Sequence, residues 1–132
     1  MQYLIDTDFL ISLHFSTEST HDKAVALAEK FLINQESSYS DLVLMECITV
    51  VSRKYSQRSA VTLAKKLRAN PQGTLSVSDR QKSQTWELFE QQTAIGASLI
   101  DCSNVVLAKI YGCQIMSFDQ FYQKFNVLAL VH

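Results

Sequence analysis

Two patterns of apolar and polar positions alternate along this chain. Short runs of β-prone residues between turn-forming residues predict strands at residues 3–5, 37–40, 73–77, 114–117 and 127–130. Apolar residues that recur every three or four positions predict helices at 7–14, 20–34, 42–56, 60–70 and 99–111, another after Ser78, and a short helical segment at 118–125. Strands that alternate with helices predict an α/β fold whose mostly parallel sheet is covered on both faces.

Polar residues at the expected helix starts set the predicted boundaries. Thr20, Asp41, Ser59 and Ser78 are residue types that cap a helix N-terminus, and Gly112 is suited to ending the helix at 99–111. The chain has only three Gly and one Pro. Because these residues are the main breakers of regular structure, we expect long helices joined by short connections.

The composition predicts one folded domain over residues 1–132. Hydrophobic residues make up 47% of the chain and charged residues 19%, which is typical of a globule with a real core. The formal net charge of −1 gives no general attraction to nucleic acid or to a membrane surface. Any affinity for RNA therefore has to come from a local concentration of charge.

Cysteine usage and the absence of long apolar runs predict a soluble, cytoplasmic protein. Cys47, Cys102 and Cys113 are odd in number, lack metal-site spacing and lie among apolar residues, as expected of free thiols in a reducing compartment. The apolar stretch 42–45 stops at Glu46, and the N-terminus has no basic segment. We therefore expect neither a secretory signal nor a membrane span.

Four carboxylates occupy positions where chemistry is often done. Asp6 directly follows the first predicted strand, Asp119 follows the strand at 114–117, and Asp101 lies at the start of the helix at 99–111. Each of these three is also explained singly as a helix cap. Glu46 has mostly apolar helical neighbours, so it is either an edge-facing or ion-paired residue or a ligand with a cation nearby.

The shared placement of these acids is more informative than any one of them. In an open parallel sheet, ligands bind outside the carboxyl ends of the strands, where Asp6 and Asp119 are expected. Carboxylates that converge there repel one another and raise each other's pKa unless a cation neutralises them. Oxygen-only ligation selects a hard ion, which predicts Mg²⁺ or Mn²⁺.

The set of motifs resembles the PIN-domain ribonucleases, including the VapC-like toxins of toxin–antitoxin pairs. The resemblance rests on Asp6-Thr7 after a strand, Glu46 in a helix, Asp101 at a later helix start, and Ser117-Phe118-Asp119 after a strand. It spans essentially the whole chain in the right order. It implies a three-layer α/β/α sandwich, a metal-dependent endoribonuclease, a homodimer, and a cognate antitoxin that covers the acidic groove.

The same resemblance implies the residues of the site and two departures from the family pattern. Asp6, Glu46, Asp101 and Asp119 would hold one or two Mg²⁺ or Mn²⁺ ions. Ser117 replaces a more usual Thr and keeps the hydroxyl. Phe121 stands where many members have another acid, which bears on a second metal position.

Four further residues are candidates for a supporting role. Thr7 belongs to the first motif, and Ser117 precedes Asp119 by two residues. Asp8 either widens the acidic pocket or caps the first helix in solvent. Asn104, one helical turn after Asp101, either supports metal-bound water or makes ordinary capping hydrogen bonds.

A basic segment follows Glu46 and is the candidate RNA-binding surface. Residues 53–78 contain no Asp or Glu, whereas they hold half of the twelve basic residues. This face would bind phosphates, with an aromatic ring for base stacking, through Arg53, Lys54, Tyr55, Arg58, Lys65, Lys66 and Arg68. A solvated helix face and a docking surface for an acidic antitoxin segment are the alternatives. His14, His21 and His132 show no paired spacing and are expected to be surface or satisfied groups.

Two other functions fit part of the pattern. Asp6-Thr7-Asp8 after a strand also begins the motif of haloacid-dehalogenase-like phosphatases, but Leu10 stands where that family has Thr or Val. A non-catalytic PIN fold that binds RNA or protein is the second alternative. Binding of a divalent metal separates the nuclease from such a module.

Overall fold

Four parallel strands form the centre of the molecule. The computed structural model describes residues 1–129, except for the side chain of Gln72. The strands are β1 (Tyr3–Ile5), β2 (Ser37–Ser40), β3 (Thr74–Leu75) and β4 (Gln114–Met116), and their order across the sheet is β3-β2-β1-β4. Tyr3 pairs with Ser37 on one side and with Gln114 on the other, all in parallel. The predicted parallel α/β sheet is confirmed.

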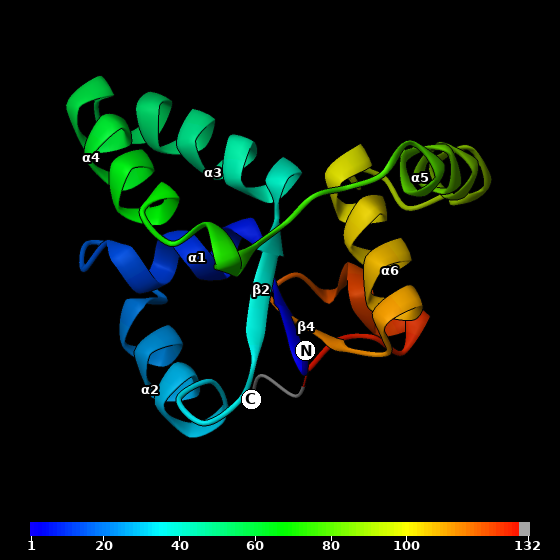
Figure 1. Ribbon diagram of the computed structural model, residues 1–132, viewed down its shortest axis with the longest axis horizontal. Coiled ribbons are helices and arrows are strands. Elements are labelled where there is room, and N and C mark those ends of the chain that lie inside the picture. The colour runs from blue at the N-terminus through cyan, green and yellow to red at the C-terminus, as the bar shows by residue number, and fades with distance from the viewer. Residues whose placement is uncertain (130–132) are drawn as a thin grey trace.

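Helices cover both faces of this sheet, giving the predicted three layers (Figure 1). On one side lie α1 (Thr7–His14), α2 (His21–Phe31), α3 (Asp41–Lys54) and α4 (Gln57–Arg68). On the other lie α6 (Leu99–Tyr111) and the short 3₁₀ helix η2 (Gln120–Phe125), with α5 (Asp79–Gln91) packed against α6. A second 3₁₀ turn, η1 (Pro71–Gly73), leads into β3.

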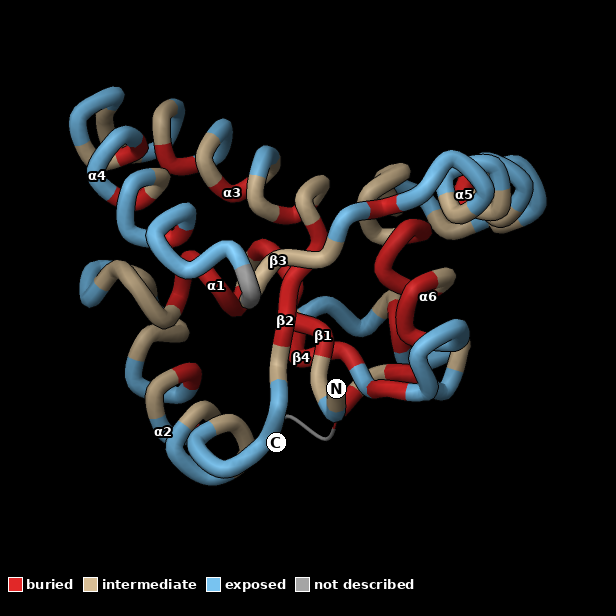
Figure 2. The backbone as a smooth tube through the Cα atoms, viewed as in Figure 1, coloured by how far each residue is buried: buried red, intermediate tan, exposed pale blue. Residues whose placement is uncertain are grey.

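Side-chain alternation along the strands divides the core into two clusters. Ile5 and Met116 pack with the buried faces of α1 to α4, whereas Leu4 and Ile115 pack with α6 and η2. Successive residues of a strand point to opposite faces of the sheet, so one short strand serves both clusters. Figure 2 shows the result as a buried sheet with exposed outer helix faces.

Several predicted boundaries are corrected by local hydrogen bonds. The cap of α3 is Ser40 and not Asp41, because the Ser40 hydroxyl accepts from the Val43 N–H at 3.0 Å. The cap of α4 is Ser56 and not Ser59, whose own N–H donates to the Ser56 hydroxyl. Thr20 does occupy the cap position of α2, but its side chain makes no capping bond there.

The predicted helix boundaries at Ser78 and Gly112 hold. The helices predicted at 20–34 and 42–56 end earlier, at Phe31 and Lys54, and β4 ends at Met116 and not at residue 117. Two other predicted strands are also shorter. Ser78 caps α5 in a capping box, and Gly112 ends α6 in the left-handed region at φ 65°. β3 covers only two residues of the predicted 73–77. The predicted strand at 127–130 is wrong as a strand: Leu128 forms one parallel bridge to Ile115, and Leu130 lies outside the described residues.

The strand order creates the place where a site forms. The chain leaves β1 through α1 and α2 toward β2 on one side, whereas β4 is reached through α5 and α6 on the other. The boundary between β1 and β4 is therefore a topological switch point, where a crevice opens at the carboxyl ends of the strands. In the part of the chain that the structure describes, no helix is both long and apolar enough to cross a bilayer.

Candidate functional site

Asp6 sits at the carboxyl end of β1 and caps α1. Its carboxylate accepts the Thr7 N–H at 2.8 Å, and the side chain is only 4% exposed. Asp6 therefore caps α1, and its role as a metal ligand stays a prediction.

Three side chains from other elements converge on the Asp6 carboxylate. Asn104 of α6 donates to one oxygen at 3.0 Å. The Ser117 hydroxyl after β4 lies 2.9 Å from the other oxygen, and the Tyr122 hydroxyl of η2 lies 3.1 Å from it. Asp6 is thus held by side chains of α6, of η2 and of the segment after β4, so its orientation is fixed.

Asp8 belongs to the same site and is not a solvated cap. Its carboxylate accepts the Phe118 N–H at 3.1 Å and lies 3.1 Å from the Ser117 hydroxyl. The rings of Phe9 and Phe118 stack with centroids 5.4 Å apart, which holds the loop after β4 against α1. The first turn of α1 and the end of β4 are therefore joined through Asp8.

The two carboxylate oxygens of Asp101 have different surroundings. One oxygen accepts the Ser98 N–H at 2.9 Å in the capping box of α6, and the other lies 3.2 Å from the Tyr122 hydroxyl. Asn104, one turn later, also donates to Tyr122 at 3.1 Å. The buried phenol of Tyr122 therefore links the Asp6 and Asp101 carboxylates.

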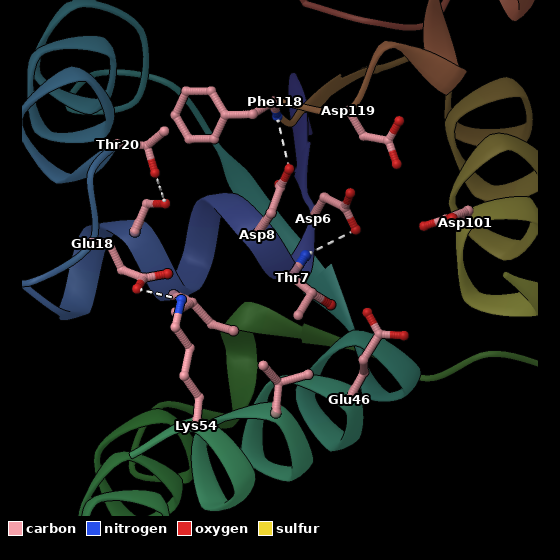
Figure 3. A pocket seen from close by; sticks show the side chains of 13 residues that line it. Asp6, Thr7, Asp8, Glu18, Thr20, Glu46, Lys54, Asp101, Phe118 and Asp119 are labelled. Carbon is pink, nitrogen blue, oxygen red and sulfur yellow. Dashed lines mark hydrogen bonds and ion pairs between the residues drawn. The ribbon is translucent and has the colours of Figure 1, made fainter. Parts of the chain in front are cut away.

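The remaining two predicted acids border the same cavity. Glu46 projects from the first half of α3, and Asp119 caps η2 through the Phe121 N–H at 2.9 Å. Figure 3 shows both pointing into the space between β1, α3 and α6, together with Asp6 and Asp101. The cavity has a volume of about 420 Å³, and its acidic lining residues are Asp6, Asp8, Glu18, Glu46, Asp101 and Asp119.

Burial and mutual repulsion raise the pKa of three carboxylates of the cavity, those of Asp6, Asp8 and Glu46. Burial, with the charges of Asp8 and Asp101, raises the pKa of Asp6 to about 7. Burial also raises the pKa of Asp8 to about 6, with a smaller contribution from Asp119. The pKa of Glu46 is raised too, first by burial and then by Asp101. A cation in the cavity would reverse these effects.

The number of available hydrogen-bond donors also indicates that the carboxylates of the cavity need a proton or a cation. Ser117 and Tyr122 each carry one hydroxyl proton, yet the two hydroxyls lie within hydrogen-bond distance of Asp6, Asp8 and Asp101. Two protons cannot serve four contacts with ionised carboxylates. A shared proton or a cation is needed to balance the group.

The residues present fit a hard divalent cation. Among residues 1–129, no three His, Cys, Asp or Glu side chains lie close enough together in this structure to hold one ion. The available donors are nevertheless all oxygens, the set that Mg²⁺ and Mn²⁺ prefer. The buried Thr7 hydroxyl also lines the cavity, and its oxygen has no hydrogen-bond partner among the described residues. An ion with its shell of water would use that oxygen.

The far end of the cavity carries an ion pair. Lys54 donates to Glu18 at 2.7 Å, and Tyr55 donates to the same carboxylate at 2.6 Å (Figure 3 shows the ion pair). The Tyr55 ring stacks on Phe15 with centroids 4.3 Å apart. One face of the ring predicted to stack on RNA bases is therefore already covered by protein.

The residues of the predicted basic surface border two different pockets or neither of them. Lys54 lines the acidic cavity, whereas Arg58 and Lys66 line a separate pocket with His14. Arg53, Lys65 and Arg68 are exposed, and neither pocket includes them. As expected, His21 is satisfied, since its Nδ1 lies 2.7 Å from the Ser12 carbonyl. His132 lies outside the described residues.

Sequence reasoning missed Tyr122 and Glu18. Tyr122 is fully buried and contacts three site residues, but its role depends on contacts across 18 to 116 residues of sequence. A buried tyrosine needs a partner for its hydroxyl, which is the one general signal available. Glu18 lies in the connection between α1 and α2 and has no distinctive sequence context.

A parallel α/β/α sandwich with an acidic cavity at its switch point defines the class of this protein. A model of the PIN domain matches residues 3–127. The chain therefore belongs to the PIN-domain family. No curated protein matches the chain in sequence.

Solved structures with the same fold are distant in sequence. VapC20 of Mycobacterium tuberculosis, described as a Sarcin-Ricin loop cleaving toxin, is 21% identical with a TM-score of 0.86, covering 96% of this chain and 97% of that one. A toxin–antitoxin complex from Klebsiella pneumoniae is 16% identical with a TM-score of 0.72, covering 99% and 98%. VapBC2 of Rickettsia felis, bound to a DNA fragment from its promoter, is 17% identical with a TM-score of 0.67, covering 97% and 96%.

Proposed function

We propose that this PIN-domain protein is a metal-dependent endoribonuclease and acts as the toxin of a toxin–antitoxin pair. The observation that carries the proposal is the convergence of Asp6, Asp8, Asp101, Asp119 and Glu46 on one cavity at the β1–β4 switch point. A purely structural cluster of this kind would be destabilising, since its members raise one another's pKa. Clusters of perturbed groups in a cleft are typical of functional sites.

Mg²⁺ or Mn²⁺ would be held by Asp6, Glu46, Asp101 and Asp119. Such an ion supplies positive charge that polarises a phosphodiester and makes a water molecule more acidic. We expect RNA products with 5′-phosphate and 3′-hydroxyl ends.

The chain's own residues prepare this site in three ways. Ser117 and Asn104 fix the orientation of the Asp6 carboxylate. The Tyr122 hydroxyl lies within hydrogen-bond distance of both Asp6 and Asp101 on the buried side of the cavity, so it ties the positions of these two carboxylates together. Glu46 brings a further carboxylate to the cavity from α3.

A protein partner is part of the proposal. The similar structures include a toxin–antitoxin complex from Klebsiella pneumoniae and FitAcB from Neisseria gonorrhoeae. By analogy we propose a cognate antitoxin that covers the acidic cavity, and a homodimer. An antitoxin segment with a cationic side chain would satisfy the carboxylates.

The alternative functions make different predictions. The family match leaves the phosphatase interpretation without support, and Asp8 bonds to the Phe118 N–H and Ser117 as a holding group. A non-catalytic PIN module would keep the fold but bind no divalent ion. The presence of all four expected acids in one cavity favours the nuclease.

Two measurements on purified protein test the proposal. Calorimetric titration with Mn²⁺ reports metal binding, and incubation with total RNA in Mg²⁺ or EDTA reports cleavage and the chemistry of the ends. Asp6→Asn should abolish cleavage while the protein stays folded. Glu87→Gln is the matched control, because Glu87 is an exposed acid on α5 outside the cavity.

The two readouts separate the possible outcomes. Metal-dependent cleavage that is lost in Asp6→Asn and kept in Glu87→Gln supports the nuclease. Metal-independent cleavage, or cleavage retained in Asp6→Asn, contradicts the assignment of the site. Failure to bind Mn²⁺ at millimolar concentration would favour the binding module.

A further inference from the structure

A second pocket lies between the C-terminal end of α1 and one face of α4. Its volume is about 350 Å³, and it is lined by His14, Phe15, Arg58, Ser59, Thr62, Leu63 and Lys66. It shares no lining residue with the acidic cavity. The lining contains two permanent cations and no carboxylate, so this pocket is positively charged whereas the first cavity is acidic.

Residues 1–129 provide no counter-ion for the cations of this pocket. Within residues 1–129, neither Arg58 nor Lys66 takes part in an ion pair. The sequence supplies no acid nearby, because residues 47–78 contain no Asp or Glu. The Lys66 charge also reaches His14, whose pKa is lowered first by burial and then by Lys66. An anion in the pocket would relieve this repulsion.

Two hydroxyl side chains, Ser59 and Thr62, line the pocket. The Ser59 hydroxyl oxygen accepts from the Ser56 hydroxyl at 3.0 Å, so its own proton is directed elsewhere. Thr62 lies one helical turn from Arg58 and Lys66 on the same face of α4. Donors from Arg58, Lys66 and Ser59 thus border one space, which suits the several oxygens of a phosphate.

Apolar groups of the same pocket favour a nucleotide over a simple carboxylate. Phe15 and the buried Leu63 form part of the lining, and the Phe15 ring is held by stacking on Tyr55. An aromatic ring beside phosphate-binding cations is the arrangement by which proteins hold single-stranded nucleic acid. The side chain of an acidic peptide would leave that apolar surface uncovered.

We propose that this pocket, bordered by His14, Phe15, Arg58 and Lys66, binds a phosphate and the adjoining nucleoside of single-stranded RNA away from the bond that is cut. The inference rests on the proposed ribonuclease function. Helix α1 connects the two sites: Asp8 borders the acidic cavity and His14 the cationic pocket. Six residues of helix separate them by about 9 Å, which a short stretch of RNA spans.

Binding of a short single-stranded RNA oligonucleotide to metal-free protein tests the pocket without cleavage. Fluorescence anisotropy over a range of salt concentrations gives the affinity and its salt dependence. Arg58→Gln with Lys66→Gln should raise Kd about tenfold and reduce the slope of log K against log salt by about 1.4, as expected for two lost phosphate contacts. Arg80→Gln with Lys109→Gln is the matched control, since these exposed cations lie on α5 and α6 (Figure 1).

A third variant separates the pocket from a general basic surface. Lys65→Gln with Arg68→Gln removes the same charge from α4 outside the pocket. We expect Kd to rise about twofold or less in this variant. An effect equal to that of the pocket variant would show that charge on α4 acts without a defined site, and would overturn the proposal.

The His14 ring gives a local readout by NMR. A bound phosphate should raise the pKa of His14 in the wild-type chain, but not in the Arg58→Gln/Lys66→Gln variant. His14→Gln identifies the signal among the three histidines. If a polyglutamate peptide shifts this signal and the RNA oligonucleotide does not, the pocket is a protein-docking site and the RNA proposal is wrong.

Failure of this inference can be told apart from failure of the proposed function. RNA bound at the pocket by a protein that neither binds Mn²⁺ nor cleaves RNA would leave the pocket supported and the nuclease rejected. Metal-dependent cleavage with unchanged RNA affinity in the Arg58→Gln/Lys66→Gln variant would reject the pocket and leave the nuclease standing.

Discussion

The Ser117 hydroxyl lies 2.9 Å from the Asp6 carboxylate, and this contact joins the carboxyl ends of two neighbouring parallel strands. The residues are 111 positions apart in sequence. Because β4 pairs with β1 in register, the side chains that follow each strand meet at one edge of the sheet. The acidic cavity is therefore a direct consequence of the strand order β2-β1-β4.

The raised pKa values of Asp6 and Asp8 predict how the stability of the metal-free protein depends on pH. A carboxylate whose pKa is higher in the folded state stabilises the fold when protonated, and this contribution is lost as pH rises. The free energy of unfolding should therefore fall between about pH 4 and about pH 7, the range bounded by the ordinary pKa and the value of about 7 for Asp6. A decrease of about 1–3 kcal/mol is expected.

Urea unfolding at several pH values in EDTA measures this decrease. In the Asp6→Asn/Asp8→Asn variant, the dependence over the same range should largely disappear, and stability at pH 7.5 should equal or exceed that of the wild-type chain. A wild-type protein whose stability rises from pH 4 to 7 would contradict the predicted protonation of the cavity.

Divalent metal should reverse the instability at neutral pH. An ion that binds only the folded state at one hundred times its Kd adds about 2.7 kcal/mol to the free energy of unfolding. Thermal unfolding at pH 7.5 with Mn²⁺ should thus show a clear increase in Tm. Asp101→Asn should remove most of this increase, whereas Asp79→Asn, an exposed acid on α5, should not.

The sequence predicted an element boundary correctly where the interactions that set it are local in the chain. The helix at 99–111 was placed correctly because its periodicity and Gly112 are both local signals. The caps of α3 and α4 were misplaced by one and three residues, because neighbouring polar residues compete and hydrogen-bond geometry decides between them. The strand at 127–130 was overestimated because β-prone composition does not fix the extent of pairing.

Site residues that directly follow strands could be predicted from the sequence. Site residues whose role depends on tertiary contacts could not. Asp6 and Asp119 follow strands, so a parallel sheet brings them to one edge. Asp8 was ambiguous because the bond that decides its role comes from the distant Phe118 N–H. Tyr122 was missed since its hydroxyl meets Asp6 and Asp101 only after folding.

The three cysteines should be unreactive until the protein unfolds. Cys47, Cys102 and Cys113 are all buried free thiols, and burial raises the pKa of each, that of Cys47 to about 12. Since the thiolate is the reactive form, a disulfide-exchange reagent at pH 8 should react slowly with the folded protein and with all three thiols in denaturant. Rapid reaction of the folded protein would contradict this packing.

Tyr122→Phe tests the residue that links the two halves of the site. The substitution removes one hydroxyl from a fully buried side chain and keeps the ring that packs against Phe121. Burial and the charges of Asp6 and Asp101 raise the pKa of Tyr122, so the phenol stays protonated and remains a donor at every physiological pH. Without it, the contacts with the Asp6 and Asp101 carboxylates and the acceptor for Asn104 are lost.

The expected result is a loss of about 1–2 kcal/mol in the free energy of unfolding and a decrease of about tenfold in Mn²⁺ affinity. Tyr111→Phe is the control, because this tyrosine is 45% exposed on α6. Urea unfolding and calorimetric titration measure the two effects separately. If Tyr122→Phe lowers stability and leaves the metal affinity unchanged, the hydroxyl supports the core alone, and the orientation of Asp6 and Asp101 depends on Asn104, Ser117 and Ser98 instead.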